Sequence, residues 1–247
     1  MNRRVLLLFG LTMLAAIPTV AALWFAFSGD DASRVVVLAP SSLAPLEDTI
    51  DAALEAEGID AVEWVFAGSQ SLVAQIADGA PVDVLITADR VSFDAAIAAG
   101  FDTGNRITFA TNHLVLAVAP GNPGDVEALS DLGDPGLLVG LCAVEVPCGR
   151  LAVEALDSIS IVPSVDTRET SVRALTTKIA SGELDAGLIY RSDAVAADLD
   201  VVDETALDHV ITIYQSAWTD GRANATFAGF LTTAEFQRIL LDAGFGT

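Results

Sequence analysis

Basic residues are scarce in this chain. It carries 12 Lys and Arg against 34 Asp and Glu in 247 residues, and Lys178 is its only lysine, so the formal net charge at pH 7 is −22. Nucleic-acid surfaces depend on clustered Lys and Arg, so we expect no nucleic-acid partner. The same charge repels small anions at long range. An anion site in this chain therefore has to hold its ligand through directed hydrogen-bond donors.

Cysteine and histidine are almost as rare. Cys142 and Cys148 are the only cysteines, and His113 and His209 start apolar runs without further ligands at a metal-binding spacing. A metal coordination sphere is incomplete with these residues, and we expect no metal-cation site. Outside the cytoplasm the cysteine pair typically forms a disulfide, which stabilises by roughly 2 kcal/mol for so short a loop. The alternative is a reactive thiol at a helix N-terminus.

The sequence also lacks the motifs that mark common catalytic sites. It contains no Gly-x-Ser-x-Gly elbow, no Gly-rich loop ending in Lys-Ser or Lys-Thr, and no His-Glu zinc motif. A Cys148 nucleophile needs a nearby base, and the sequence nominates none. We therefore expect no enzyme and no cofactor, with a thiol-dependent enzyme using Cys148 as an alternative.

A long apolar run is present only at the N-terminus. Arg3 and Arg4 precede the nearly uninterrupted apolar residues 5–27. This pattern predicts that residues 1–28 are a signal peptide or an N-terminal membrane anchor, because the run is long enough to span a bilayer. The protein is then exported to the periplasm or the outer face of the cytoplasmic membrane, and this segment is its only expected membrane contact.

The rest of the chain alternates between strand-like and helix-like segments. This alternation predicts an α/β fold with mainly parallel sheets flanked by helices. Two runs of such units and a returning C-terminal piece indicate two lobes with a ligand cleft between them. Lobe 1 is expected at 33–114 and 210–247, and lobe 2 at 115–209. Within lobe 2, residues 160–163 predict a short strand before the next helix.

Small polar residues stand where predicted strands end and helices begin. Residues 66–89 have the pattern of a strand, a turn, a helix, a turn and a second strand, and Ser69 is expected to cap that helix. Ser42 occupies the equivalent position in the preceding unit. A helix N-terminus presents unpaired N–H groups and can hold a small anion without a basic side chain. The alternative is an ordinary crossover with a capping serine.

Two later segments offer further donors. Pro147 predicts a helix start, and we expect the N–H groups of Cys148 and Gly149 to be free there. Tyr190 ends a predicted strand with its hydroxyl at the tip, where simple packing is the alternative role. Because ligands of parallel sheets bind at the carboxyl ends of the strands, these groups are candidates for one common site.

Several blocks of sequence, in this order, resemble the molybdate-binding proteins of bacterial ABC importers, members of the periplasmic binding protein superfamily. The blocks are 38–43, 66–89, 146–150, 171–175, 188–194 and 243–245. The resemblance implies that molybdate or tungstate is bound between two lobes, without a metal cation, and is delivered to an ABC permease and its ATPase. It also implies a monomer.

The same resemblance implies a set of ligand donors. The hydroxyl donors are Ser42, Ser69 and Tyr190, and the backbone N–H donors are Cys148 and Val172. One departure concerns this set, because the family usually has Ala-Ala-Ser-Leu where this chain has Pro-Ser-Ser-Leu, so Ser41 is an alternative to Ser42. Sulfate and phosphate are the alternative ligands. A pocket of donors alone disfavours protonated phosphate, because that anion also needs an acceptor.

Overall fold

The computed structural model describes residues 34–59, 61–101, 104–202 and 205–247. The predicted signal peptide or anchor, residues 1–28, lies outside these ranges. Among the described residues, the helices are all too short or too polar to cross a bilayer.

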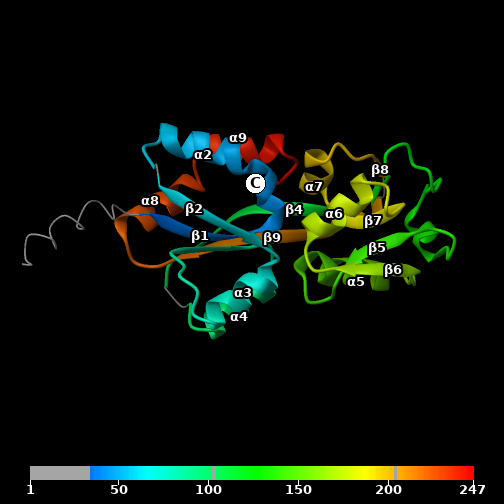
Figure 1. Cartoon of the computed structure of the whole chain (residues 1–247), viewed down its shortest axis with the longest axis horizontal. Helices are drawn as coiled ribbons and strands as arrows, with labels where there is room; N and C mark the ends of the chain where they lie inside the picture. The colour runs from blue at the N-terminus through cyan, green and yellow to red at the C-terminus, as the bar shows by residue number, and fades with distance from the viewer. Residues whose placement is uncertain (1–33, 60, 102–103, 203–204) are drawn as a thin grey trace, which may run out of the picture. The chain divides into compact units, whose positions relative to one another are not determined.

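Within the described residues, nine strands form one sheet (Figure 1). In spatial order the main path runs β2 (Val62–Ala67), β1 (Val35–Pro40), β3 (Val84–Thr87), β9 (Ile211–Trp218), β4 (Arg106–Val118), β7 (Ala186–Tyr190), β5 (Val139–Cys142) and β6 (Val165–Glu169). The short β8 (Val201–Val202) pairs with β4 off this path.

Parallel pairs lie toward both ends of the sheet and antiparallel pairs lie in its middle. β1 pairs in parallel with β2 and β3, and β5 pairs in parallel with β6 and β7. Between them, β4 and β9 run antiparallel from Arg106 opposite Ala217 to His113 opposite Ile211. β4 continues past this pairing to β7. The long β4 therefore joins the two groups of parallel strands.

Helices follow most of the strands and cover both faces of the sheet (Figure 1). With 3-10 helices labelled η, they are η1 (Ser41–Leu46), α2 (Glu47–Ala56), α3 (Ser69–Ala77), α4 (Arg90–Ala98), η2 (Leu129–Gly133), α5 (Pro147–Ser158), α6 (Val172–Ala180), α7 (Arg191–Ala196), η3 (Thr205–Leu207), α8 (Arg222–Phe230) and α9 (Ala234–Asp242). Gly79 and Gly182 adopt positive φ just after α3 and α6, which glycine does without steric cost.

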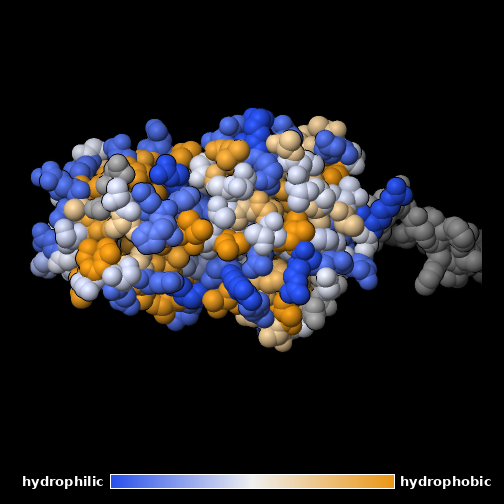
Figure 2. Space-filling model, turned by 180° about the vertical axis from the view of Figure 1, so that it is seen from behind, coloured by the Kyte–Doolittle hydropathy of each residue, from blue (hydrophilic) through white to orange (hydrophobic). Residues whose placement is uncertain are grey.

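The buried apolar side chains form three separate clusters. One cluster draws all its buried members from residues 114–210. The other two draw theirs from residues 35–110 and 214–245. Each end of the sheet therefore has its own apolar core. On the face seen in Figure 2, apolar residues are scattered among hydrophilic ones.

The strand predicted at 160–163 is wrong. Ser160 has a φ of 58° in the turn after α5, and the Val162 side chain is 85% exposed. The strand of this unit is instead β6, Val165–Glu169, whose residues alternate between half-buried and exposed. β6 lies at the end of the strand order and packs on one face only. Its sequence therefore alternates between inward and outward residues and contains no apolar run that would predict a strand.

Candidate functional site

A small cavity lies where η1, α3, α5 and α6 begin and β7 ends. Its lining includes all five residues expected to bind a ligand, Ser42, Ser69, Cys148, Val172 and Tyr190, and also Ser41. The cavity volume is about 10 Å³, which is room for roughly one water-sized sphere. The cavity therefore suits a small ion better than a sugar or a peptide.

Ser41 and Ser42 open η1 directly after strand β1, and both side chains are buried. The Ser42 Oγ lies 2.7 Å from the hydroxyl oxygen of Tyr214 on β9. The structure therefore places both alternative serines at the cavity and gives Ser42 a buried hydrogen-bond partner.

Ser69 is the first residue of α3, not its cap, so the expected capping role is wrong. Gly68 occupies the N-cap position with an extended backbone. The Ser69 hydroxyl oxygen instead accepts a hydrogen bond from the Ala88 N–H at 3.1 Å, at the end of β3. A hydroxyl that accepts one bond keeps its own hydrogen for another. Ser69 can therefore donate into the cavity.

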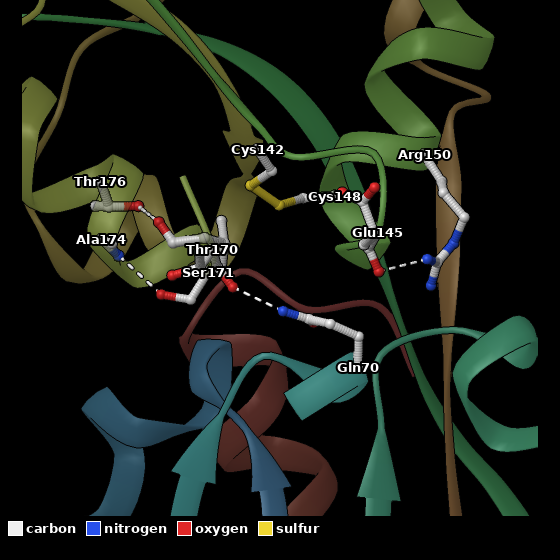
Figure 3. Close-up of a disulfide and its surroundings, with 10 residues drawn as sticks. Gln70, Cys142, Glu145, Cys148, Arg150, Thr170, Ser171, Ala174 and Thr176 are labelled. Carbon is white, nitrogen blue, oxygen red and sulfur yellow. Dashed lines mark hydrogen bonds between the residues drawn. A yellow bond between two sulfur atoms is a disulfide. The ribbon is translucent and has the colours of Figure 1, made fainter. Parts of the chain in front are cut away.

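Gly68 also permits a close contact between two segments that are far apart in the sequence. A Cβ at Gly68 would lie 2.8 Å from the Thr170 carbonyl oxygen, which is too close. The Gln70 Nε2 donates to that same oxygen at 2.9 Å (Figure 3). The start of α3 is thereby tied to the end of β6 beside the cavity.

Cys148 lies in the first turn of α5 and is joined by a disulfide to Cys142 at the end of β5 (Figure 3). This confirms the predicted pairing. The Cys148 N–H has no backbone acceptor among the described residues, as expected in the first turn of a helix. The Gly149 N–H, also expected to be free, donates to the Val146 carbonyl at 3.0 Å. That part of the prediction is wrong, because the chain turns tightly into the helix.

Val172 begins α6, and the preceding Ser171 caps it by accepting from the Ala174 N–H at 3.2 Å (Figure 3). As the first residue of the helix, Val172 has an N–H without a backbone acceptor among the described residues. Because the N-terminus of a helix carries a partial positive charge, this N–H suits an anionic acceptor.

Tyr190 ends β7 with its side chain 1% exposed. Its hydroxyl has no hydrogen-bond partner among the described residues. Burial, helped by nearby Tyr214 and acidic groups, raises the pKa of Tyr190 well above its ordinary value, although the nearby Thr212 hydroxyl opposes the shift, so the Tyr190 hydroxyl keeps its hydrogen. A buried donor without an acceptor costs about 1–3 kcal/mol. A ligand oxygen in the cavity would remove that cost.

Beside the cavity, Arg150 of α5 contacts the start of α4. Its guanidinium pairs with Asp89 and donates to the Ser92 Oγ at 3.0 Å and the Glu145 carbonyl at 2.6 Å (Figure 3 shows the last contact). Asp89 also caps α4 by accepting from the Ser92 N–H. The sequence reasoning missed this ion pair, although Arg150 ends one of the blocks that carry the family resemblance.

The described residues contain no group of three or more His, Cys, Asp or Glu side chains that could hold a metal ion. The cavity lining instead combines the hydroxyls of three serines and Tyr190 with apolar residues. These hydroxyl groups can surround an anion but are poor ligands for a cation.

Asp193 is a buried acid on α7 whose Oδ2 lacks a partner among the described residues. Burial raises its pKa from 3.8 to about 7, although the nearby Arg173 opposes the shift. Between pH 4 and 7 the folded state therefore binds more protons at Asp193 than the unfolded state does. The contribution of this group to stability falls as pH rises through that window, by up to about 4 kcal/mol.

Asp193→Asn is expected to flatten this dependence, because the amide has no charge to bury. Urea unfolding at pH 5, 6 and 7 should show the variant gaining stability relative to the wild type as pH rises. Parallel curves for the two proteins would show that Asp193 titrates normally.

Comparisons with known proteins show the family of this chain. The family described as "Bacterial extracellular solute-binding protein" matches residues 35–246. The molybdate-binding protein ModA of Mycobacterium tuberculosis is 34% identical over 222 residues, covering 87% of this chain and 85% of the relative. ModA of Escherichia coli is 32% identical over 228 residues, covering 85% and 88%. These matches confirm the resemblance seen in the sequence blocks.

The periplasmic molybdate-binding protein of Azotobacter vinelandii has a similar structure. The TM-score is 0.72 at 20% sequence identity, and the match covers 86% of this chain and 99% of that one. This likeness confirms the predicted α/β fold.

Proposed function

The chain belongs to the bacterial extracellular solute-binding proteins, and on this premise we propose that it captures molybdate, or its close analogue tungstate, in the cavity. The observation that carries the proposal is the buried Tyr190 hydroxyl, a donor without a hydrogen-bond acceptor among the described residues, in a cavity whose lining includes further donors. A fully deprotonated tetrahedral oxyanion offers acceptors in every direction and no donor of its own.

The proposed ligand donors are the hydroxyls of Ser42, Ser69 and Tyr190 and the backbone N–H groups of Cys148 and Val172. Ser41 shares the cavity lining and is the alternative to Ser42. Neutral donors suit a chain of net charge −22, since they act only at contact distance and need no basic patch.

We propose that the two groups of strands act as lobes that close on the ligand by bending at β4 and β9, a hinge motion. Residues 33–114 and 210–247 form the first lobe and residues 115–209 the second. The protein works as a monomer outside the cytoplasm and delivers the oxyanion to an ABC permease driven by its ATPase. Residues 1–28 export it or anchor it to the membrane.

Calorimetric titration with molybdate, tungstate, sulfate and phosphate tests this function. We expect tight binding of the first two and little heat from the others. Phosphate at neutral pH carries a hydroxyl that needs an acceptor, and sulfate, although fully deprotonated, is smaller than molybdate and reaches fewer donors at once. Preference for phosphate or sulfate would contradict the proposed ligand.

Arg150→Gln tests the closure. The variant loses the ion pair with Asp89 and the bond to Ser92, both of which join the proposed lobes. Since these groups are only partly exposed, we expect the closed state to lose about 1–2 kcal/mol and ligand release to become roughly 5- to 30-fold faster.

Stopped-flow measurement of ligand release, with Arg238→Gln as the control, distinguishes closure from a general effect of charge. Arg238 forms exposed ion pairs with Glu235 and Asp242 on α9, away from the cavity, and its loss should leave the release rate unchanged. Equal release rates in the wild type, Arg150→Gln and Arg238→Gln would exclude Arg150 as a contact of the closed state.

A further inference from the structure

A chain of buried polar groups leads from the cavity to the long strand pair. Ser42 on η1, Tyr214 on β9, Asn112 on β4 and Ser192 on α7 are each at most 3% exposed. The Ser42 Oγ lies 2.7 Å from the Tyr214 hydroxyl, which lies 3.4 Å from the Asn112 Nδ2. The same Nδ2 donates to the Ser192 Oγ at 2.7 Å. Of these groups, only Ser42 lines the cavity.

The direction of each hydrogen bond in this chain follows from the Asn112 amide. Its Oδ1 accepts from the His113 N–H at 3.0 Å, which fixes the Nδ2 on the opposite side. An amide nitrogen has two hydrogens and can only donate, so one goes to Ser192 and the other to Tyr214. The Tyr214 hydroxyl thus accepts from Asn112. Its single hydrogen is then directed at the Ser42 Oγ.

This arrangement leaves the Ser42 hydroxyl able only to donate into the cavity. Its oxygen then accepts from Tyr214, and in the part of the chain that the structure describes its own hydrogen has no other buried acceptor, so that hydrogen is free for the cavity. Burial raises the pKa of Tyr214, which keeps the hydrogen on the phenol oxygen. Ser42 therefore faces the ligand as a donor.

We infer that Tyr214, oriented by Asn112, is a positioning residue that fixes Ser42 as a hydrogen-bond donor and thereby favours fully deprotonated oxyanions over hydrogen phosphate. The inference rests on the proposed function and deepens it. Without the Tyr214 hydroxyl, the Ser42 hydroxyl can rotate and accept, which is the role that the hydroxyl of hydrogen phosphate requires.

The Tyr214 ring is held independently of its hydroxyl. It packs edge-on against Phe109 and Phe245, with ring centroids 6.3 Å and 5.4 Å away. Tyr214→Phe retains these contacts and removes only the oxygen. The variant therefore tests the hydrogen bond without opening a cavity in the core.

The experiment is a double-mutant cycle read by calorimetry with molybdate and with phosphate at neutral pH. The proteins are the full chain and its variants Tyr214→Phe, Ser42→Ala and the double variant. We expect Tyr214→Phe to weaken molybdate binding roughly 5- to 20-fold and to reduce the molybdate-to-phosphate preference. In the Ser42→Ala background, Tyr214→Phe should alter the affinity less than about twofold, because the Ser42 hydroxyl that Tyr214 orients is absent.

Tyr190→Phe is the matched comparison, since it removes the other tyrosine hydroxyl of the chain. Its effect should be similar with and without Ser42, because Tyr190 faces the ligand directly. Unchanged molybdate affinity in Tyr214→Phe, or an equal loss in both backgrounds, would overturn the inference. If the wild type binds neither molybdate nor tungstate, the proposed function itself fails, whereas tight wild-type binding with no coupling rejects only the role of Tyr214.

Discussion

Replacing Gly149 by alanine is expected to destabilise the fold by about 3 kcal/mol and to weaken ligand binding. A Cβ at this position would lie 1.9 Å from the Ala143 carbonyl oxygen and 2.7 Å from that of Cys142. Both are backbone atoms of the turn that the disulfide closes, so no flexible side chain can move aside. The first turn of α5 has to shift, and with it the N–H of Cys148.

Gly229→Ala is the matched control for this prediction. Gly229 also lies inside a helix, α8, but nothing stands within 4 Å of a Cβ placed there. Since alanine favours a helix over glycine, this change should stabilise by roughly 0.5–1 kcal/mol and leave binding unaltered. Urea unfolding and calorimetry on both variants give the comparison. Similar stability changes would mean that the close approach at Gly149 is relaxed in solution.

The pattern of strands and helices could be predicted because it depends on local periodicity. The predicted helix within residues 66–89 and the predicted helix start at Pro147 show this, since α3 and α5 lie there. Donor positions followed from the rule that strand ends and helix starts gather at one edge of a sheet. For this reason Ser42, Ser69 and Tyr190 could be predicted from the sequence to share one site, and all three line the cavity.

Contacts between distant segments could not be predicted in this way. Arg150 and Asp89 are 61 residues apart, Gln70 and Thr170 are 100 apart, and Ser42 and Tyr214 are 172 apart. The strands nearest to these residues are not neighbours in the sheet, and each pair forms only because the whole fold brings the helix starts and strand ends together. Nothing in the local sequence of Tyr214 distinguishes a core tyrosine from one that orients a ligand donor.

The role of Ser69 shows how a correct position can carry a wrong local explanation. Serine before an apolar helix usually caps it, and this preference led to the capping prediction. In the structure Gly68 is the N-cap, and the hydroxyl reaches across to Ala88. The side-chain oxygen of a capping serine accepts from a backbone N–H of its own helix. Here the hydroxyl links two strand ends and its hydrogen remains available.

Ser69→Ala is expected to weaken molybdate binding by about 1–3 kcal/mol, or roughly 5- to 150-fold, because a buried dianion loses one of its few donors. The change also leaves the buried Ala88 N–H without its acceptor, so the free energy of unfolding should fall by about 1–3 kcal/mol. Calorimetry gives the first quantity and urea unfolding the second.

Ser158→Ala separates the two effects. The Ser158 hydroxyl also forms one hydrogen bond, to the Ala155 carbonyl at 2.7 Å, but it lies at the far end of α5 and outside the cavity lining. Its loss should cost a little stability and no affinity. Ser69→Ala is expected to lower both the stability and the affinity for molybdate. Its loss of affinity counts as a ligand effect only if it is larger than the loss measured for Ser158→Ala. Wild-type affinity in Ser69→Ala would remove this serine from the ligand shell and leave it a purely structural link between α3 and β3.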